Sequence, residues 1–255
     1  MAEGEGFTER SWHWWVSRIA VPLFVAVVTV GGTLYVNRDK LGGATESSEV
    51  KMSIDSDPGS SDGGGWGPAR ELFTMDRPAT YAVLNSITDD PKAGDRRNFT
   101  RIRHADSDEK FGDSVQVRVG DTLEVYVGVF NECSDQYAES PAATLHGLTA
   151  QLGNTKLGRH VAFGVILQAK NAFAVWDGAA VDIDVPGRLT MLENTAVMHT
   201  SDVPNMTLND DGFSHGEHLT LGQYQQDGEY PVGKTPTGWQ RGAGYLTFRM
   251  HVDKA

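Results

Sequence analysis

The sequence is poor in cysteine and in basic residues. Cys133 is the only cysteine among 255 residues, so the chain cannot form an internal disulfide. One thiol also excludes a zinc site built from several cysteines. Lysine and arginine number 22 against 34 aspartates and glutamates, which gives a net charge of −12 at pH 7. Because a field of that sign repels phosphate backbones, we expect no nucleic acid among the partners.

Motifs of the common enzyme and nucleotide-binding classes are also missing. No Gly-x-Ser-x-Gly elbow, P-loop or dinucleotide fingerprint occurs in the chain. Internal repeats, which would indicate a solenoid or a propeller, are not evident. We therefore expect no cofactor, and a binding or structural module is favoured over an enzyme.

One long uncharged run lies near the N-terminus. Residues 19–36 contain no charged side chain. As a helix at about 1.5 Å per residue they would cover roughly 27 Å, close to the hydrocarbon thickness of a bilayer. Trp14 and Trp15 before the run and Tyr35 at its end suit the two membrane interfaces. We predict a transmembrane helix over residues 19–37 that contacts the lipid bilayer, with a cleavable signal peptide as the alternative.

The predicted helix divides the chain into four parts. Residues 1–18 form a short cytoplasmic tail. Residues 38–65 are rich in glycine, serine and aspartate, cannot bury apolar surface, and are expected to form a flexible linker. Residues 66–255 form the extracytoplasmic domain, because a short tail before a large C-terminal part favours an N-inside orientation. The expected location is the cell membrane, single-pass, with the C-terminal domain extracellular.

The C-terminal domain has the period-two alternation of β-strands and no sustained helical period. Val115–Val119 and Leu123–Val129 flank Gly120-Asp121, which predicts a hairpin. Further predicted strands are Tyr81–Leu84, Thr144–Leu152, His160–Leu167, Ala180–Val185, Leu189–Leu192, His218–Leu221 and Tyr245–Val252.

Between these strands, glycine, proline, asparagine and aspartate mark turns, as in Asp184–Gly187 and Asn209–Gly212. We predict an all-β fold, an antiparallel β-sandwich of Ig-like or adhesion type. Two small sandwiches that divide near residues 170–180 are the alternative. The long loops between about residues 194 and 242 are expected either to carry function or to cover sheet edges.

Histidines and acids gather in one of these loops. His215, Glu217 and His218 follow Asp210 and Asp211. Zinc or calcium could use such side chains, but the spacing is neither that of a helical HExxH site nor that of an EF-hand. A solvated loop with a turn is the favoured interpretation, and we predict no metal.

Candidate catalytic carboxylates are also present. Asp182 and Asp184 alternate onto one face of a predicted strand, where a hydrolase could use them if a partner lay across a cleft. Solvent-facing acids on strands are common, so we predict no catalytic residue. Cys133 has no neighbouring histidine or aspartate pattern that would activate its thiol. Other acidic clusters are Asp89-Asp90 and Asp106 with Asp108 and Glu109.

Aromatic and basic side chains offer two possible binding surfaces. Four aromatic residues fall in or near predicted loops, where they either pack into the core or stack on a ligand. They are Trp176, Tyr224, Tyr230 and Trp239. Four arginines form a local basic cluster that is structural if paired to acids, and is free to meet an anionic polymer or lipid head group if exposed. They are Arg96, Arg97, Arg101 and Arg103.

Several segments resemble one known family. Asn85–Asp90 followed by Gly94–Phe99 is similar to the "NSITDNP…GDERNF" signature of an uncharacterised domain in actinobacterial surface and membrane proteins. The similarity spans about residues 79–252 and continues through Val119–Val127, Asn131, Val175–Asp177, Leu221-Gly222, Asp227-Gly228 and Gly244–Phe248. The resemblance implies an extracytoplasmic β-sandwich of unassigned function and carries over no catalytic residue.

The chain departs from that family at two places. Val232 and Gly233 follow Pro231 where family members have a cysteine, and Glu132 stands in place of the second asparagine of an Asn-Asn pair.

Taken together, the order of anchor, linker and sandwich predicts a membrane-anchored extracytoplasmic module without catalytic activity. Its expected role is binding or structural, in contact with an envelope polymer or a surface protein. Two alternatives stay open: an envelope hydrolase with a carboxylate or histidine site, and the ligand-sensing subunit of a membrane complex.

Overall fold

Strands dominate both parts of the chain that the structure describes. The computed structural model describes residues 27–30, 33–36, 65–153 and 155–255. They belong to two units, an N-terminal hairpin and a β domain, and each is described by itself. The hairpin consists of β1 (Val27–Val30) and β2 (Thr33–Val36).

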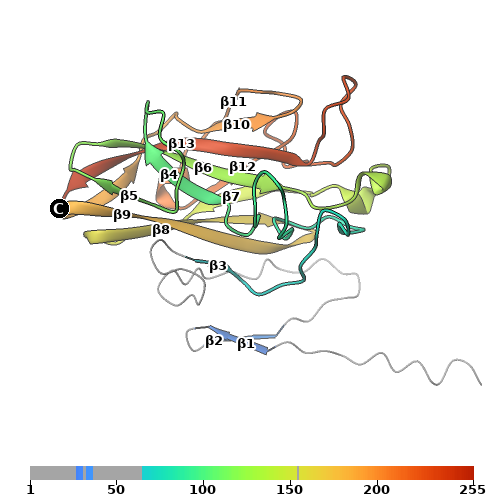
Figure 1. Cartoon of the computed structure of the whole chain (residues 1–255), viewed down its shortest axis with the longest axis horizontal. Coiled ribbons are helices and arrows are strands. Elements are labelled where there is room, and N and C mark those ends of the chain that lie inside the picture. The colour runs from blue at the N-terminus through green and yellow to red at the C-terminus, as the bar shows by residue number, and fades with distance from the viewer. Residues whose placement is uncertain (1–26, 31–32, 37–64, 154) are drawn as a thin grey trace, which may run out of the picture. The chain divides into compact units, whose positions relative to one another are not determined.

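The strands of the β domain (Figure 1) are β3 (Trp66–Gly67), β4 (Thr100–His104), β5 (Ser114–Val117), β6 (Thr122–Phe130), β7 (Thr149–Leu152), β8 (Gly158–Ala169), β9 (Ala172–Met191), β10 (Val197–Thr200), β11 (Met206–Thr207), β12 (His218–Thr220) and β13 (Ala243–Lys254). Three short 3-10 helices are the only helices of the described residues. They are η1 (Asp135–Tyr137), η2 (Pro141–Ala143) and η3 (Phe213–His215).

The transmembrane helix predicted over residues 19–37 is not supported. The described residues of that range form the antiparallel pair β1–β2, in which Val27 lies opposite Val36 and Val30 opposite Thr33. β-branched residues favour extended backbone, and the strands flank a Gly-Gly dipeptide of the kind that closes tight hairpins. No described helix is long and apolar enough to span a membrane. The predicted tail 1–18, the linker up to residue 64 and the rest of 19–37 lie outside the described residues.

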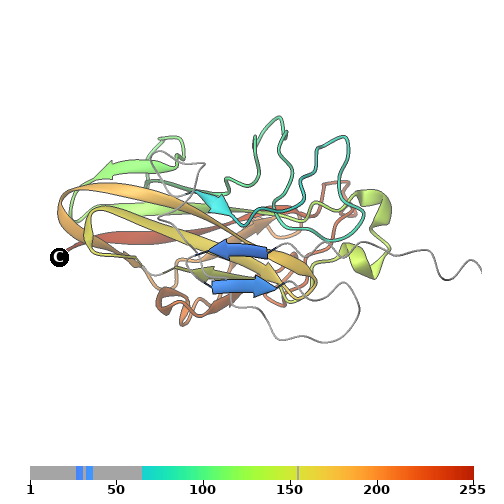
Figure 2. The ribbon, with the colours of Figure 1, turned by 90° about the horizontal axis from the view of Figure 1, so that it is seen from below.

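The strands of the β domain form two layers. One layer has the order β12-β7-β8-β9, and the other has the order β11-β10-β13-β6-β4. Figures 1 and 2 show the long hairpin β8–β9 running along one side and β13 with β6 along the other. All pairings within these two layers are antiparallel, so the predicted antiparallel all-β class is confirmed.

β9 belongs to both layers. Its residues 172–182 pair with β8, and its residues 187–191 pair with the C-terminal end of β13. The predicted turn at Asp184–Gly187 is wrong, because this segment lies inside β9 where the strand passes from one layer to the other. A strand of 20 residues can serve two layers because strands twist along their length.

The predicted hairpin around Gly120-Asp121 is also wrong in its pairing. The turn is present, but β5 pairs in parallel with residues 180–183 of β9, whereas β6 pairs with β4 and β13. Tyr81–Leu84, predicted as a strand, is a loop, and β4 and β10 arise where no strand was predicted. Strand alternation is a local property, whereas the choice of partner depends on the whole domain.

One hydrophobic core lies between the layers, so the alternative of two small sandwiches is wrong. Alternate residues of each long strand enter this core, as the period of two requires. The completely buried ones include Leu123, Val125, Val127 and Val129 of β6, Val161, Phe163, Val165 and Leu167 of β8, and Leu246 and Val252 of β13. Phe213 of η3 packs edge-on against Phe248 of β13, with ring centroids 5.5 Å apart.

Long loops gather at the end of the domain away from the C-terminus (Figure 1). Backbone hydrogen bonds join loops that are far apart in sequence, as from Leu145 N to Tyr230 O at 3.1 Å and from Ala82 N to Ala142 O at 2.8 Å. The amide of Gly233 donates to Asp135 Oδ1 at 3.0 Å. The strands thus provide a rigid base on which this end presents its side chains.

Candidate functional site

A buried polar cluster lies under the segment that carries the family resemblance. Its centre is Glu132, whose side chain is completely buried. Its carboxylate accepts hydrogen bonds from the amides of Ser86 and Ile87, at 3.2 and 3.4 Å, and from Arg96 Nη1 at 2.6 Å. Burial raises the pKa of Glu132, and Arg96 opposes that shift. Burying the Glu132 carboxylate without such partners would cost several kcal/mol. The hydrogen bonds of the cluster therefore offset the cost of packing Glu132 beneath this segment.

Two arginines complete the cluster. Arg96 also pairs with Asp90 and lies 4.3 Å above the ring of Phe130. Arg70 donates to Ser86 Oγ at 2.9 Å and to the carbonyl of Asn85 at 2.7 Å. Burial lowers the pKa of Arg70 to about 10.

Asn85 fastens the same segment to β6. Its backbone has φ of +42°, a left-handed conformation that asparagine tolerates better than most residues. The side chain donates to the carbonyl of Gly128 at 2.8 Å and accepts from the amide of Phe130 at 3.0 Å. The side chain of Asn85 therefore makes the hydrogen bonds to the end of β6 that the backbone of a neighbouring strand would otherwise make.

A second buried carboxylate, that of Asp177 on β9, joins the two layers. It accepts hydrogen bonds from the amides of Phe99 and Thr100, where β4 begins. Burial raises the pKa of Asp177 well above its ordinary value, although these donors and the amide of Gly178 oppose the shift.

The predicted arginine cluster is mostly structural. Arg96 pairs with Glu132 and Asp90, Arg97 pairs with Asp95, and Arg103 pairs with Glu124 at 2.6 Å. Only Arg101 has no acidic partner among the described residues; its Nη2 donates to the carbonyl of Ala93 at 3.5 Å. A surface for an anionic polymer is not formed by these four side chains together.

The side chains weighed as metal ligands or catalysts are spread out. His218 of β12 aligns through Gln151 and Ile166 with Trp176 on β9. Asp182 lies six residues farther along β9, which is roughly 20 Å at about 3.3 Å per residue. Asp182 instead contacts His160 at 2.8 Å. These groups therefore do not converge on a common reaction centre.

The other candidates have structural or exposed positions. Asp210 is buried and caps the amides of Asn194, Thr195 and Ala196 at 2.8 to 3.1 Å. His215 contacts its neighbour Ser214. No group of three or more His, Cys, Asp or Glu side chains in the described part of the chain is placed to hold a metal.

Two further predictions concern acids and the lone thiol. Asp184 is exposed on β9, Asp89 accepts from the amide of Met75, and Asp106 pairs with Arg249 at 2.7 Å. Cys133 is buried, and burial raises the pKa of its thiol. A raised pKa disfavours the thiolate, so this cysteine is not an activated nucleophile.

The four aromatic side chains separate into two pairs. Tyr230 is completely buried, and the ring of Trp176 packs on Gly67 with 7% of the residue exposed. Tyr224 and Trp239 are 45% and 70% exposed. Only the second pair is available to a ligand.

A row of stacked planar groups, which sequence reasoning missed, covers the outer face of β4, β6, β13 and β10. Tyr126 stacks on Tyr245 with centroids 5.0 Å apart, and Tyr245 stacks on His199 at 4.4 Å. Phe111 continues the row beside Tyr126, and Arg103 lies 4.2 Å above Phe111. Cross-strand register brings these residues together, and no sequence motif marks them.

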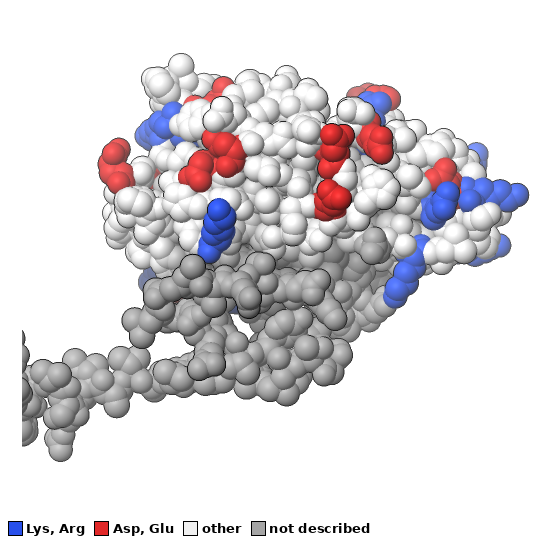
Figure 3. Space-filling view, turned by 180° about the vertical axis from the view of Figure 1, so that it is seen from behind, with Lys and Arg blue, Asp and Glu red and all other residues white. Residues whose placement is uncertain are grey.

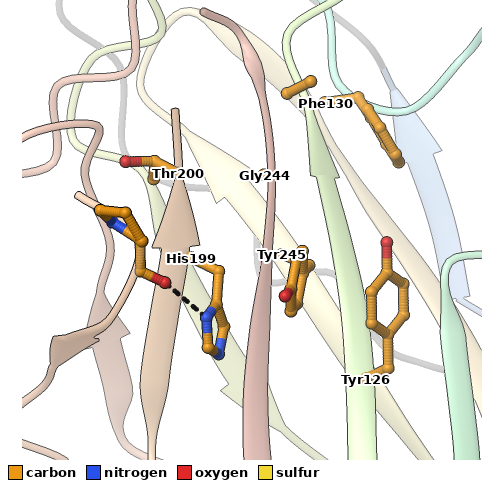
Figure 4. A pocket seen from close by; sticks show the side chains of 8 residues that line it. Tyr126, Phe130, His199, Thr200, Gly244 and Tyr245 are labelled. Atoms are coloured by element: carbon orange, nitrogen blue, oxygen red, sulfur yellow. Dashed lines mark hydrogen bonds between the residues drawn. The ribbon is translucent and has the colours of Figure 1, made fainter. Parts of the chain in front are cut away.

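A depression of about 360 Å³ adjoins this row (Figure 4). Its floor is the backbone of Ala243 and Gly244, and its walls are rings that include Phe130, Tyr245 and His199. Glycine is required at position 244, because a Cβ there would lie only 2.5 Å from the buried hydroxyl of Tyr230 beneath the strand. The depression is shallow and open to solvent, so it can cover only one side of a ligand.

Hydrogen bonds fix the wall of the depression. Nδ1 of His199 lies 2.6 Å from the carbonyl of Pro204 (Figure 4), and Nε2 lies 3.1 Å from Thr247 Oγ1. Because a carbonyl only accepts, Nδ1 carries the proton and donates it. The hydroxyls of Tyr126 and Tyr245 have no hydrogen-bond partner within the described ranges.

Next to the depression lies a group of side chains that we name the loop platform: Asp202, Gln223, Tyr224 and Arg241, together with Trp239, which precedes Arg241 by two residues on the adjoining hairpin. Asp202 accepts from Arg241 Nε at 3.1 Å and from Gln223 Nε2 at 2.8 Å. The guanidinium of Arg241 lies 5.0 Å from the ring centroid of Tyr224. The turn that carries Asp202 also supplies Thr200 and Pro204 to the depression, so this part of the platform adjoins it.

The hairpin that presents Trp239 is held in place. Lys234 and Gln240 are bridged across it, the amide of Trp239 donates to Thr235 Oγ1 at 2.9 Å, and Gln240 donates to Asp135.

Elsewhere, on the face in Figure 3, acidic and basic side chains are interspersed and form no large patch of one sign.

Comparison with protein-family models, with curated proteins and with solved structures returned no match. The resemblance carried by Asn85–Phe99 and the predicted Ig-like or adhesion-type topology stay predictions.

Arg96→Ala should destabilise the domain by about 3–5 kcal/mol, because it leaves the buried Glu132 carboxylate without its charged partner. Arg249→Ala is the matched control, since the exposed pair with Asp106 contributes less than about 1 kcal/mol. Urea unfolding followed by circular dichroism measures both, and Arg96→Ala combined with Glu132→Gln should recover part of the loss. Equal midpoints for the two single variants would contradict the role of the cluster.

The stability of the wild-type protein relative to Asp177→Asn should fall as the pH rises. The folded protein keeps a proton on Asp177 that the unfolded chain releases from about pH 4 upward, so the unfolded state is favoured progressively through the raised pKa. Asparagine cannot titrate and lacks this component. Unfolding free energies of both proteins between pH 4 and 8 give the comparison, and a difference that stays constant or grows in favour of wild type would refute it.

Proposed function

We propose that the β domain is a binding module without catalytic activity, and that the loop platform with its adjoining depression is the ligand site. The single observation that carries this proposal is the contrast among the aromatic side chains. Those on the sheet face are stacked on one another, whereas Tyr224 beside Arg241, and Trp239 on the braced hairpin that leads to Arg241, are exposed. An aromatic side chain on a braced loop offers a ligand a large contact area at a low cost in conformational entropy.

The spread of the candidate catalytic groups supports the same proposal. General acid–base catalysis needs its groups within hydrogen-bond reach of one reacting atom. Asp202, the acid of the platform, is engaged in an ion pair, and Asp182 and His218 lie far apart. The hydrolase and sensor alternatives have no comparable observation in their favour.

The proposal includes a location at the cell envelope, with the β domain outside the cytoplasm. Its support comes from the sequence alone: the uncharged run 19–36, whose described part is the β1–β2 hairpin and not a helix, precedes a composition typical of a linker. An antiparallel sandwich of adhesion type suits such a display role.

Binding at the platform can be tested before its ligand is identified. The full chain, kept soluble in amphipol and labelled with 5-fluorotryptophan, should show a shifted Trp239 fluorine resonance when a panel of oligosaccharides, peptides and lipid vesicles is added. Trp239→Phe assigns the signal. Trp239→Ala should abolish binding of whichever member shifts it, whereas Phe173→Ala, at an exposed ring outside the platform, should not. A panel without a single member that moves Trp239 would count against the proposal.

Removal of residues 19–37 should release the protein from the membrane. The full chain should stay in the membrane pellet after an alkaline carbonate wash and be cut by protease added to intact cells, because an uncharged segment of this length partitions into lipid. The deletion variant should leave the pellet. Recovery of the intact full chain in the soluble fraction, protected from the protease, would overturn the proposed location.

A further inference from the structure

Most stacking surfaces on the sheet face of this site are already occupied. In the row Arg103, Phe111, Tyr126, Tyr245 and His199, the ring of Tyr245 is stacked between Tyr126 and His199. Phe111 lies tilted against Tyr126 and has the guanidinium of Arg103 over its ring. Phe130 is likewise covered by Arg96 on one side, and its ring edge fills the space above Gly128 on the other. A ligand cannot stack on rings whose faces are already occupied.

The loop platform is the exception. Trp239 is 70% exposed and has no ring or cation partner in the described part of the chain. Tyr224 is 45% exposed and has Arg241 over one face only. The face of an aromatic ring is electron-rich, so it attracts the weakly positive C–H groups that a pyranose ring presents on its apolar face. Two such rings suit a flat ligand with one apolar side.

Planar polar groups stand beside Tyr224. The side chains of Asp202 and Arg241 are only 10% and 20% exposed, and they hold each other in a fixed orientation through Nε and Nη2. Nη1 of Arg241 has no partner among the described residues. Gln223 is completely buried, donates to Asp202 and Ser201, and its Oε1 has no hydrogen-bond partner in the described part of the chain. Carboxylate and guanidinium groups offer paired acceptors and donors that match vicinal hydroxyl groups.

The charge of the platform selects among ligand classes. Asp202 and Arg241 neutralise one another, and the depression is lined by uncharged side chains apart from the engaged ring of His199. The net charge of −12 opposes anionic polymers and anionic lipid head groups. A proline-rich peptide needs a groove between aromatic ridges, whereas Trp239 stands singly on a hairpin.

We propose that the ligand of the loop platform is a neutral saccharide, with one pyranose stacked on Trp239, a neighbouring ring against Tyr224, and hydroxyl groups bonded to Asp202 and Arg241. This inference rests on the proposed binding function and names its ligand class. The adjoining depression extends the site along the sheet, so a short oligosaccharide fits better than a single sugar.

Isothermal titration of the full chain in amphipol tests the ligand class. The probes are tetrasaccharides of β-1,4-linked glucose, mannose and N-acetylglucosamine, with oligogalacturonate, a proline-rich decapeptide and phosphatidylglycerol vesicles as competing classes. At least one neutral tetrasaccharide should bind, and Trp239→Ala and Tyr224→Ala should each weaken it about tenfold, the typical effect of losing one stacked ring. Asp202→Asn should weaken it as well, whereas Phe173→Ala should leave it unchanged.

The outcomes separate this inference from the proposed function. Binding of the peptide or of the vesicles alone, lost in Trp239→Ala, would overturn the saccharide and keep the binding module. Saccharide binding that is unaffected by Trp239→Ala and Tyr224→Ala would overturn the placement of the ligand on the platform. The absence of binding by every probe, together with an unmoved Trp239 fluorine resonance, would refute both.

Discussion

The carboxyl group of Asp177 is the buried polar group that joins the two layers. It lies between β9 and the start of β4, and it satisfies amides that would otherwise be buried without a partner. An unpaired buried amide costs on the order of 1–3 kcal/mol. Loss of this side chain would therefore weaken the closure of the strands over their core, on which the surface features of the domain are built.

The segment Asn85–Phe99 is held against the sheet by buried polar interactions of the same kind. Its asparagine caps β6 and its arginine neutralises Glu132, so the residues that carry the family resemblance are used mainly to hold a loop against a sheet. The residues of this segment are thus explained by packing, and they do not mark the proposed ligand site. That site lies instead on the loops around Asp202 and Trp239, outside the motif.

The two aromatic surfaces show how tertiary structure separates similar residues. Tyr126, Tyr245 and His199 cover the sheet because register places them on neighbouring strands. Tyr224 and Trp239 project from loops that are braced by hydrogen bonds to Asp202, Thr235 and Asp135. Mutual stacking lowers the exposed area of the first group, whereas the second group keeps the exposed area that recognition requires.

Local pattern alone determined that the C-terminal domain is all-β, and alternation located β6, β8 and β13, because the period of two depends only on neighbouring residues. It also determined that no nucleotide or zinc-thiolate motif is present. Only the tertiary structure decided that β5 pairs with β9, that β9 serves both layers, and that Tyr230 is buried while Trp239 is exposed. Pairing and exposure depend on residues distant in sequence, so no local pattern could have predicted them.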